Sequence, residues 1–476
     1  MTASAIDEQK HVLLTAHPLQ RVGAFALCAL GEAAGPGQLT AAQFDAAVEC
    51  MRDHAVRAAS VTDTKADGGF WLKASGSFFP NSKMNHPSRL SKRDGLRDAV
   101  SQWRQMPPAE VWPEADCALC GRQAVGFYGK VDVALAESVS YRNTVPRGHA
   151  GLALCWACLC CFYALPYGCV LTGGPSSVLH SLEDPFLRER VFRQVARNKE
   201  YLALGLAPAK SLLTREAVAL QQLRTYDREL RAGVDLLVFS NSNRDQSLVV
   251  HSLDQPMAEW LRRTSRPSRR AGFTALVRAH RTRQTPGFNG LARNAFRNPG
   301  GIVGAAVGYL SRRVEATRAV PDDARDLAQV CRDFARGVLH MNDDDIKQIE
   351  VLGDNLAAVI AMDTVRGHLT GLLRAARDTR LLQAQLQTMS AKWLLSPPPD
   401  TSGPLLTTRQ FRLLFDPDGR SWLYRQLLIV AVLQKLSERD WRPSNAKEQV
   451  AELDQELEAQ EHIDSRAIDG WDGEQA

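Results

Sequence analysis

The sequence lacks the long apolar segments that place a chain in a membrane. A membrane-spanning helix needs roughly 20 consecutive apolar residues, and the strongest apolar run, residues 423–436, is shorter and contains Arg425 and Gln434. Residues 1–10 are polar, and the apolar stretch after them is interrupted by Pro18, which is not the pattern of a secretory signal peptide. We therefore expect a cytoplasmic protein with no membrane partner.

The sequence also lacks the short motifs of common catalytic sites. It has no nucleophile elbow, Walker loop, dinucleotide-binding fingerprint or HExxH motif. Asp343–Asp345 are consecutive carboxylates, so on a helix they point in three directions. They fit a helix N-terminus, where negative charge is favourable, better than a metal-dependent nuclease site. Catalytic groups can still assemble from distant positions, but we predict no catalytic residues and favour a binding protein over an enzyme.

Cysteine is the residue type whose positions are most informative. The chain has 10 cysteines among 476 residues, which fits reduced thiols in a cytoplasmic protein better than a disulfide scaffold. Residues 117–120 read CALC and, after 34 further residues, residues 155–161 read CWACLCC. Two Cys-x-x-Cys turns in one segment are typical of a zinc ion held by four thiolates, because each turn directs two sulfur atoms at the ion and two turns complete the tetrahedron.

The second turn of this pattern has two possible ligand pairs. Cys155 and Cys158 have the required spacing, and so do Cys158 and Cys161. Three further candidates are Cys160, Cys169 and His149. A site with four sulfur ligands has no open coordination position, so we expect the metal to stabilise the fold and not to catalyse a reaction.

Charge is strongly segregated along the chain. Residues 261–314, the arginine segment, contain twelve arginines, no lysine and no acidic residue, so they carry +12, although the whole chain carries only +5. Residues 446–476, the acidic tail, carry −8, and their composition predicts a flexible end. A solvated face normally mixes charges of both signs, whereas arginine alone suits phosphate oxygens. We predict nucleic-acid contacts from Arg262, Arg263, Arg266, Arg269, Arg270, Arg278, Arg281, Arg293 and Arg297.

A second basic stretch, residues 78–93, reads FFPNSKMNHPSRLSKR. Its prolines and asparagines indicate turns, and basic and amide side chains beside aromatic rings suit nucleic-acid contact on a loop. The alternative is an ordinary surface loop with an aromatic anchor. The predicted contact residues of this loop are Asn81, Lys83, Asn85, Arg89, Lys92 and Arg93.

Hydrophobic periodicity and turn signals predict an α+β fold. We expect a mixed N-terminal domain with an inserted zinc-ribbon-like module and a C-terminal all-α helical bundle. Helices are expected near residues 12–32, 41–59 behind a Thr40/Gln43 capping box, most of 187–231, and most of 322–441; strands are expected at 131–135, 138–141, 234–239 and 247–251. The predicted parts are residues 1–110 (N-terminal α/β part), 111–170 (zinc module), 171–320 (mixed part with the hairpin and the arginine segment), 321–445 (helical bundle) and 446–476 (acidic tail).

Several stretches of the chain, in a fixed order, resemble the motifs of one family. They are TAHPLQRVGAFALCAL (15–30), SFFPNSKMNHPS (77–88), CALC (117–120), VPRGHAGLALCWACLCCFYALPYG (145–168), LHSLEDP (179–185), VDLLVFSNSN (234–243) and SLVVHSLD (247–254). The family that they resemble is the CXXC–CXXC branch of the large subunits of type I CRISPR effector complexes (the Cas8a1/Cst1 family, of subtype I-B or I-A). The resemblance covers nearly the whole chain, and its specific part is the first half. One difference is Arg21, where family members often have an acidic residue.

The resemblance implies a non-catalytic subunit of a crRNA-guided complex (Cascade) in antiviral defence. Such a subunit helps recognise the protospacer-adjacent motif (PAM) on double-stranded target DNA, stabilises the R-loop and recruits the Cas3 helicase–nuclease. The implied partners are crRNA, target DNA, Cas5, Cas7, a Cas11-type small subunit and Cas3. The motif assigns structural Zn²⁺ to Cys117, Cys120, Cys155 and Cys158.

Other interpretations of the sequence remain open. The chain is alternatively a zinc-dependent nuclease or other nucleic-acid-processing enzyme, or a zinc-ribbon nucleic-acid-binding assembly factor. In several type I systems the small subunit is translated from inside the large-subunit gene. Met341 lies at the start of a helical region of small-subunit length and is a candidate internal start.

Overall fold

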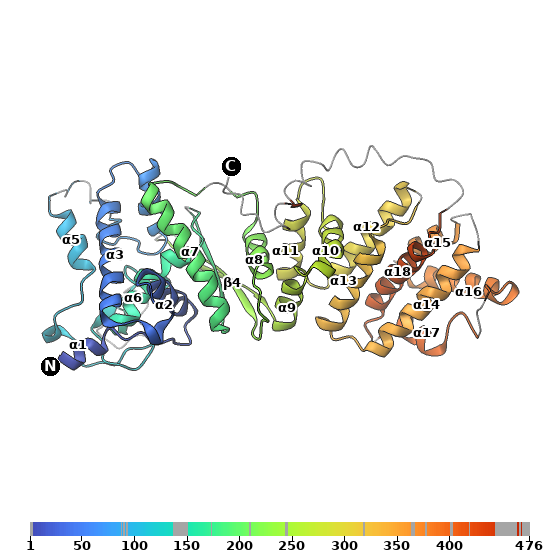
Figure 1. Cartoon of the computed structure of the whole chain (residues 1–476), viewed down its shortest axis with the longest axis horizontal. Helices are drawn as coiled ribbons and strands as arrows, with labels where there is room; N and C mark the ends of the chain where they lie inside the picture. Colours follow the sequence, from blue (N-terminus) through green and yellow to red (C-terminus); the bar gives the residue numbers. More distant parts are fainter. Residues whose placement is uncertain are drawn as a thin grey trace. The chain divides into compact units, whose positions relative to one another are not determined.

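The computed structural model describes most of the chain as a mixed α and β protein in which helices predominate (Figure 1). Two compact units are present: unit 1 is Met1–Lys210 with Ala232–Ser252, and unit 2 is Ser211–Arg231 with Leu253–Ala476. In the described part, no helix is both long and apolar enough to cross a bilayer. The described residues are 3–86, 88, 91, 94–136, 151–172, 174–208, 211–242, 246–317, 319–362, 367–376, 378–399, 403–417, 419–442, 464–465 and 468.

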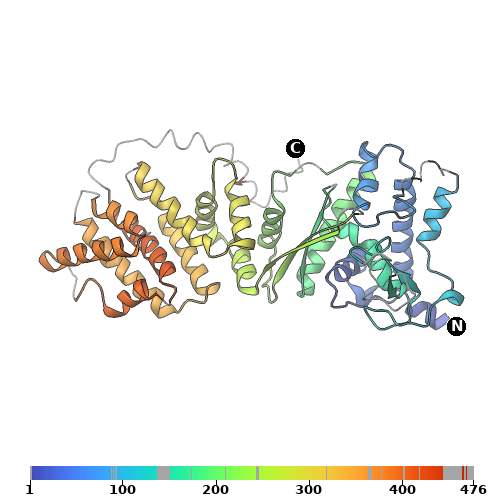
Figure 2. The same cartoon turned by 180° about the vertical axis from the view of Figure 1, so that it is seen from behind.

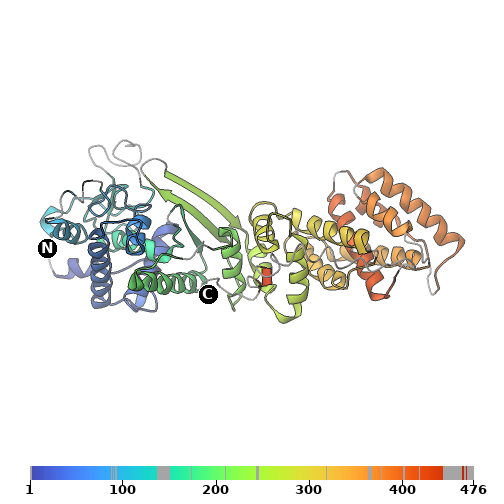
Figure 3. The ribbon, with the colours of Figure 1, turned by 90° about the horizontal axis from the view of Figure 1, so that it is seen from above.

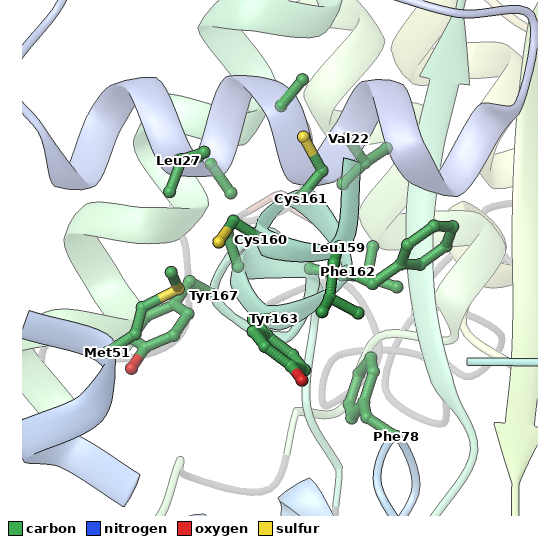
Figure 4. Packing of buried hydrophobic residues seen from close by; sticks show 14 of the residues in the cluster. Val22, Leu27, Met51, Phe78, Leu159, Cys160, Cys161, Phe162, Tyr163 and Tyr167 are labelled. Atoms are coloured by element: carbon green, nitrogen blue, oxygen red, sulfur yellow. The ribbon is translucent and has the colours of Figure 1, made fainter. Parts of the chain in front are cut away.

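Unit 1 is built around helix α6, Trp156–Gly168, every residue of which is buried. A helix that is apolar on all sides is stable only inside a core, and α6 packs against α2 (Pro18–Leu30) and α7 (Asp184–Leu204). Figure 4 shows Cys161 facing α2 beside Val22, whereas Cys160 points in another direction. The other helices of unit 1 are α1 (Ala3–Glu8), η1 (Pro36–Gln38), α3 (Ala41–Ala59), η2 (Asp67–Gly69), α4 (Phe70–Ser75), α5 (Leu96–Trp103) and η4 (Ala109–Val111).

Two small antiparallel sheets complete unit 1. Strands β1 (Gly126–Tyr128) and β2 (Leu152–Leu154) pair antiparallel. The second sheet has the order β3–β4–β5 and consists of Ser176–Ser181, Val234–Asn241 and Gln246–Leu253, the last of which ends at the unit boundary. Figure 3 shows β4 and β5 as a long two-stranded ribbon. The predicted hairpin is therefore confirmed for its strands.

Unit 2 is helical throughout its described elements, apart from the end of β5. Helix α18 lies at its centre and packs against α12, α13 and α14, and α13 also packs against α10 (Figure 2). The helices are α8 (Arg215–Arg224), α9 (Gln255–Arg263), α10 (Pro267–Ala279), α11 (Gly287–Arg297), α12 (Gly301–Thr317), α13 (Ala324–Gly337), α14 (Asp343–Ala361), α15 (Gly367–Ala375), α16 (Thr379–Leu395), α17 (Thr408–Phe415) and α18 (Ser421–Glu438).

Local capping signals agree with the structure. Thr40 and Gln43 form the predicted capping box at the start of α3, and Thr214 caps α8. Asn342 caps α14 by accepting hydrogen bonds from the backbone N–H groups of its first turn, which holds the three consecutive aspartates. These carboxylates therefore lie where the helix dipole favours negative charge.

Other predicted elements differ from the structure. Residues 131–135 form turns and not a strand, and 138–141 lie outside the described residues. The helical stretch predicted over 187–231 is two helices, α7 and α8, because α7 ends at Gly205 in the left-handed conformation (φ 68°). The unit boundary cuts through the predicted part 171–320: its strands belong to unit 1 and its arginine segment to unit 2.

The predicted zinc module is continuous with the core of unit 1. The segment after its second Cys-x-x-Cys turn is α6 itself, which is buried against α2 and α7. The apolar run that follows Cys158 explains this position, because a small solvent-exposed ribbon could not bury the thirteen residues of α6, all of which are buried here.

Candidate functional site

Four cysteines from two distant segments form one cluster. The Sγ atoms of Cys117, Cys120, Cys155 and Cys158 all lie within 4.8 Å of one another, and those of Cys120 and Cys155 are 3.5 Å apart. A tetrahedral ion with sulfur at about 2.3 Å places its sulfur ligands about 3.8 Å apart. The side chains are therefore arranged closely enough to hold one metal ion.

The first Cys-x-x-Cys turn is closed by its own backbone. The N–H of Cys117 donates to the carbonyl of Arg122 (2.6 Å), and the N–H of Gly121 donates to the carbonyl of Cys117 (2.9 Å). Gly121 has φ 75°, in the left-handed region where a side chain is disfavoured. The N–H of Ala118 bonds to the carbonyl of Ala153 in β2, which fixes the turn next to the second pair of cysteines.

The second Cys-x-x-Cys turn is the N-terminus of α6. Cys155 is the N-cap, and its Sγ accepts a hydrogen bond from the N–H of Cys158 (3.4 Å). An N-cap residue and the third helical residue direct their side chains to the same point. Cys161 lies one turn further along, where its Sγ accepts from Gln20 Nε2 of α2 (3.6 Å).

This geometry decides between the two ligand pairs that the sequence left open. The cluster contains Cys155 with Cys158, as the family motif implied, and not Cys161. Cys160 and Cys169 are buried outside the cluster. His149 is not among the described residues.

Arg122 is a part of the site that the sequence analysis did not identify. Its Nε donates to Cys120 Sγ (3.5 Å), its Nη2 to Cys155 Sγ (3.8 Å) and its Nη1 to the carbonyl of Glu8 (2.7 Å). Four thiolates around a divalent ion carry two net negative charges, and a guanidinium group beside the sulfurs offsets part of that charge. The signal was present as a basic residue directly after CALCG.

Proton sharing within the cluster follows from its hydrogen bonds. Bonds from Cys155 and Cys158 lower the pKa of Cys117. The same bonds to Cys117 raise the pKa of Cys158 and raise that of Cys155 to about 12. The Cys117 thiolate therefore forms readily, whereas Cys155 and Cys158 keep their protons until a cation replaces them.

The loop of residues 78–93 uses its aromatic rings in the core of unit 1. Phe78 and Phe79 are 0% and 2% exposed. The Phe78 ring lies edge-on to Phe239 of β4 (5.6 Å between ring centres), and Phe79 packs against Trp103 and Tyr163. These rings are not available to stack on bases, and they act as the aromatic anchor of the alternative interpretation.

Two of the predicted contact residues in this loop have structural roles. Asn85 Nδ2 donates to Ser75 Oγ (3.2 Å) and to the carbonyl of Phe79 (3.3 Å). Asn81 is exposed and has φ 58°, a conformation that asparagine tolerates better than most residues. Lys83 is exposed. The predicted contacts Arg89, Lys92 and Arg93 lie outside the described residues.

The arginine segment is less positive in space than along the chain. In the described part of the structure, at least six of its arginines form ion pairs with acidic residues, and all of these acids lie outside residues 261–314. The pairs are Arg262–Glu259 (2.6 Å), Arg263–Glu259 (3.2 Å), Arg269–Asp333 (2.7 Å), Arg278–Asp323 (3.8 Å), Arg281–Asp464 (2.8 Å) and Arg297–Glu216. The count of +12 therefore overstates the free positive charge of this surface.

Burial and ion pairing show which of the predicted nucleic-acid-binding arginines are exposed to solvent. Arg262 is 5% exposed and bonded to Glu259, and the Arg281 side chain is 6% exposed, so neither guanidinium group is freely exposed to a phosphate. Within the described residues, Arg266 and Arg293 are exposed and no ion pair is seen for either. The exposed members of the predicted set are Arg263, Arg266, Arg270, Arg278, Arg293 and Arg297.

Several segments that carry the family resemblance meet in unit 1. Arg21 of α2, the residue that differs from the family pattern, forms an ion pair with Asp184 at the start of α7. His180 of β3 lies opposite Asp235 of β4 in the sheet, with 3.7 Å between Nδ1 and a carboxylate oxygen. Burial is the main cause of the lowered pKa of His180. These polar motif residues therefore join α2 to α7 and β3 to β4.

Comparison with known proteins identifies no relative of this chain. No protein-family model matches the sequence, and neither a curated protein nor a solved structure is similar to it.

Proposed function

We propose that this chain is the non-catalytic large subunit of a crRNA-guided type I CRISPR effector complex. In this role it helps recognise the PAM, stabilises the R-loop and recruits Cas3, together with Cas5, Cas7 and a Cas11-type small subunit. The observation that carries the proposal is the ordered set of motifs around the four clustered cysteines. Such a division of work is physically reasonable, since base pairing reads the target and protein binds backbone and a short duplex motif.

The cysteine cluster has a structural role in this proposal. Zn²⁺ is the ion that four thiolates in two Cys-x-x-Cys turns favour, and such sites leave no position for a substrate. Cys117, Cys120, Cys155 and Cys158 would hold it, and Arg122 would offset part of the net negative charge of the four thiolates. The ion joins the start of α6 to residues 117–122, so zinc binding stabilises unit 1.

Nucleic-acid binding is assigned to the exposed arginines of unit 2. Each guanidinium group that contacts a phosphate releases a counterion, so affinity falls as salt rises, with a slope of about −0.9 per contact for duplex DNA. Arg266 and Arg293 are the best members to test, because both are exposed and neither has an ion pair among the described residues.

The test is salt-dependent binding of a fluorescent DNA duplex by purified protein. Replacing Arg266 and Arg293 by alanine should weaken binding and reduce the salt slope by about one per lost contact. The matched control replaces Arg380 and Arg412, exposed arginines on other helices of unit 2, and should keep both quantities unchanged. An equal loss of DNA affinity in both double variants would refute the assignment of nucleic-acid binding to the arginine segment.

Two further measurements separate the proposal from its alternatives. Co-expression with Cas5 and Cas7 proteins and a crRNA should yield a complex that contains this chain and the crRNA. Metal-dependent cleavage of nucleic acid by the purified chain would instead favour the zinc-dependent nuclease.

A further inference from the structure

The acidic tail is attached to the arginine segment through one buried carboxylate. Asp464 is 2% exposed. Its Oδ2 accepts hydrogen bonds from Arg281 Nε (2.9 Å) and Nη2 (2.8 Å), and from the N–H of Gly287 (3.2 Å). Its Oδ1 accepts from the N–H of Phe288 (2.8 Å). All four donors belong to residues 261–314, far from Asp464 in the sequence.

These donors form a site for an oxyanion. Gly287 and Phe288 are the first residues of α11, an eleven-residue helix whose N-cap, Pro286, forms no side-chain cap. The free N–H groups of a first helical turn can donate hydrogen bonds to the oxygen atoms of a carboxylate or of a phosphate group. The Arg281 guanidinium group is 6% exposed and supplies the opposite charge with two parallel N–H groups.

The backbone at Gly287 is adapted to a close approach. A β-carbon there would lie 2.1 Å from the carbonyl oxygen of Val277 and 3.1 Å from Asp464 Oδ2. Glycine therefore allows both the packing of α11 on α10 and the access of an anion to the N–H groups.

A second contact holds the same part of the tail. The carbonyl of Ile468 accepts a hydrogen bond from Arg224 Nη1 (3.0 Å). Residues 446–476 carry −8 and the arginine segment carries +12, so charge also favours this attachment. Any polyanion that binds the arginine segment meets the same field, and it reaches the same donors once Asp464 has left them.

We propose that Asp464 occupies a phosphate-binding site of unit 2 and competes with nucleic acid for it. The proposal rests on the proposed function, in which exposed arginines of the same segment bind nucleic acid. In the free protein the carboxylate fills the site. When a nucleic-acid backbone binds, one of its phosphate groups takes the hydrogen bonds of Arg281, Gly287 and Phe288, and the tail around Asp464 leaves.

The first experiment compares two variants that remove the same charge from the full chain. Asp464→Asn weakens the contact with Arg281, whereas Asp472→Asn changes a tail residue outside the described contacts. The probe is a fluorescein-labelled single-stranded DNA oligonucleotide, and the readout is its dissociation constant at low salt. If the site is free in about a tenth of wild-type molecules, Asp464→Asn should tighten binding about tenfold. Asp472→Asn should have the small effect of one lost charge.

The second experiment uses the wild-type chain, so it does not depend on the stability of a variant. Arg466 lies between the two attached residues, and trypsin cleavage after it reports whether this part of the tail is released. Saturating oligonucleotide should accelerate this cleavage, with cleavage after Lys447 as the reference for protease activity.

The outcomes distinguish the competition from the proposed function. Tighter binding by Asp464→Asn alone, with faster cleavage after Arg466, supports the competition. Normal DNA binding with unchanged cleavage after Arg466, and equal affinities of the two variants, shows that Asp464 is only a cap of α11, which overturns the competition and leaves the proposed function intact. Absence of salt-sensitive DNA binding in every variant overturns both.

Discussion

Replacing Gly23 by alanine should destabilise unit 1 through a backbone clash. Gly23 lies in α2 and faces α6, where a β-carbon would lie 1.9 Å from the carbonyl oxygen of Cys161 and 2.5 Å from its carbonyl carbon. Because the obstacle is backbone, no side-chain rotation relieves it, and the two helices must separate locally by about 1 Å. Overpacking of a tight core lowers the free energy of unfolding by about 1–3 kcal/mol. A clash with backbone atoms this close should cost an amount near the upper end of that range.

The expected net loss is about 2 kcal/mol. Alanine is favoured over glycine inside a helix by about 1 kcal/mol, which offsets part of a clash of about 3 kcal/mol. For a unit of this size, such a loss lowers the unfolding midpoint by roughly 4–8 °C. Movement of α6 also displaces Cys155 and Cys158 at its start, so the metal should be lost more readily to a competing chelator.

Two other glycines of unit 1 provide a graded comparison. A β-carbon at Gly168 would meet methyl groups of Val22 and Val191 at 3.1 and 3.2 Å, which can shift slightly, so Gly168→Ala should cost less. A β-carbon at Gly37 would meet nothing within 4 Å, so Gly37→Ala should leave the midpoint unchanged.

The assay is thermal unfolding with zinc present. The transition of unit 1 is identified as the one that a chelator shifts. A Gly23→Ala midpoint equal to or above that of the wild type would refute the close contact between α2 and α6.

Three further changes should have measurable effects. Burial lowers the pKa of His280 to about 4 from 6.5, so a proton binds the unfolded chain before it binds the folded one. As the pH falls from 6.5 to 4, the free energy of unfolding of unit 2 should therefore decrease by about 3 kcal/mol. In urea unfolding, His280→Gln should lack this pH-dependent component, whereas the exposed control His340→Asn should keep it. Cys117→Ser should lower bound zinc and the unit 1 midpoint, whereas Cys161→Ala should retain the metal; loss of zinc from the second variant alone would contradict the ligand assignment. Expression of the gene by itself should give a second, shorter product that starts at Met341, and an unchanged pattern of bands after the Met341 codon is replaced would reject this hypothesis.

The cluster of four cysteines was predictable because its determinants are local. Each Cys-x-x-Cys turn is formed by its own residues, and the spacing is visible in the sequence. The choice between Cys155 and Cys161 depended on where α6 begins, since an N-cap cysteine directs its sulfur at the turn and a cysteine one turn later faces α2. Sequence periodicity places helix ends less reliably than helices themselves.

The nucleic-acid surface was less predictable because charge is neutralised over long sequence distances. Glu216, Asp333 and Asp464 lie outside the window over which the arginines were counted, and folding brings each of them to an arginine. The aromatic rings of residues 78 and 79 present the same difficulty. A phenylalanine pair between turn signals reads as a surface loop, and only the packing of β4 and α6 shows that these rings are internal.

The division of the chain into two units also determines the order in which the ribosome synthesises the segments of each unit. The polypeptide changes unit after residues 210, 231 and 252. The three-stranded sheet of unit 1 therefore stays incomplete while the segment that contains α8 is synthesised. Helix α8 in turn lacks its packing partners, α9 and α11, until those helices have been synthesised. Unit 1 is finished only when β5 emerges. Neither unit is one continuous stretch of polypeptide, so nascent chains that stop between residues 241 and 246 expose the edge of β4 and the apolar side of α8 together.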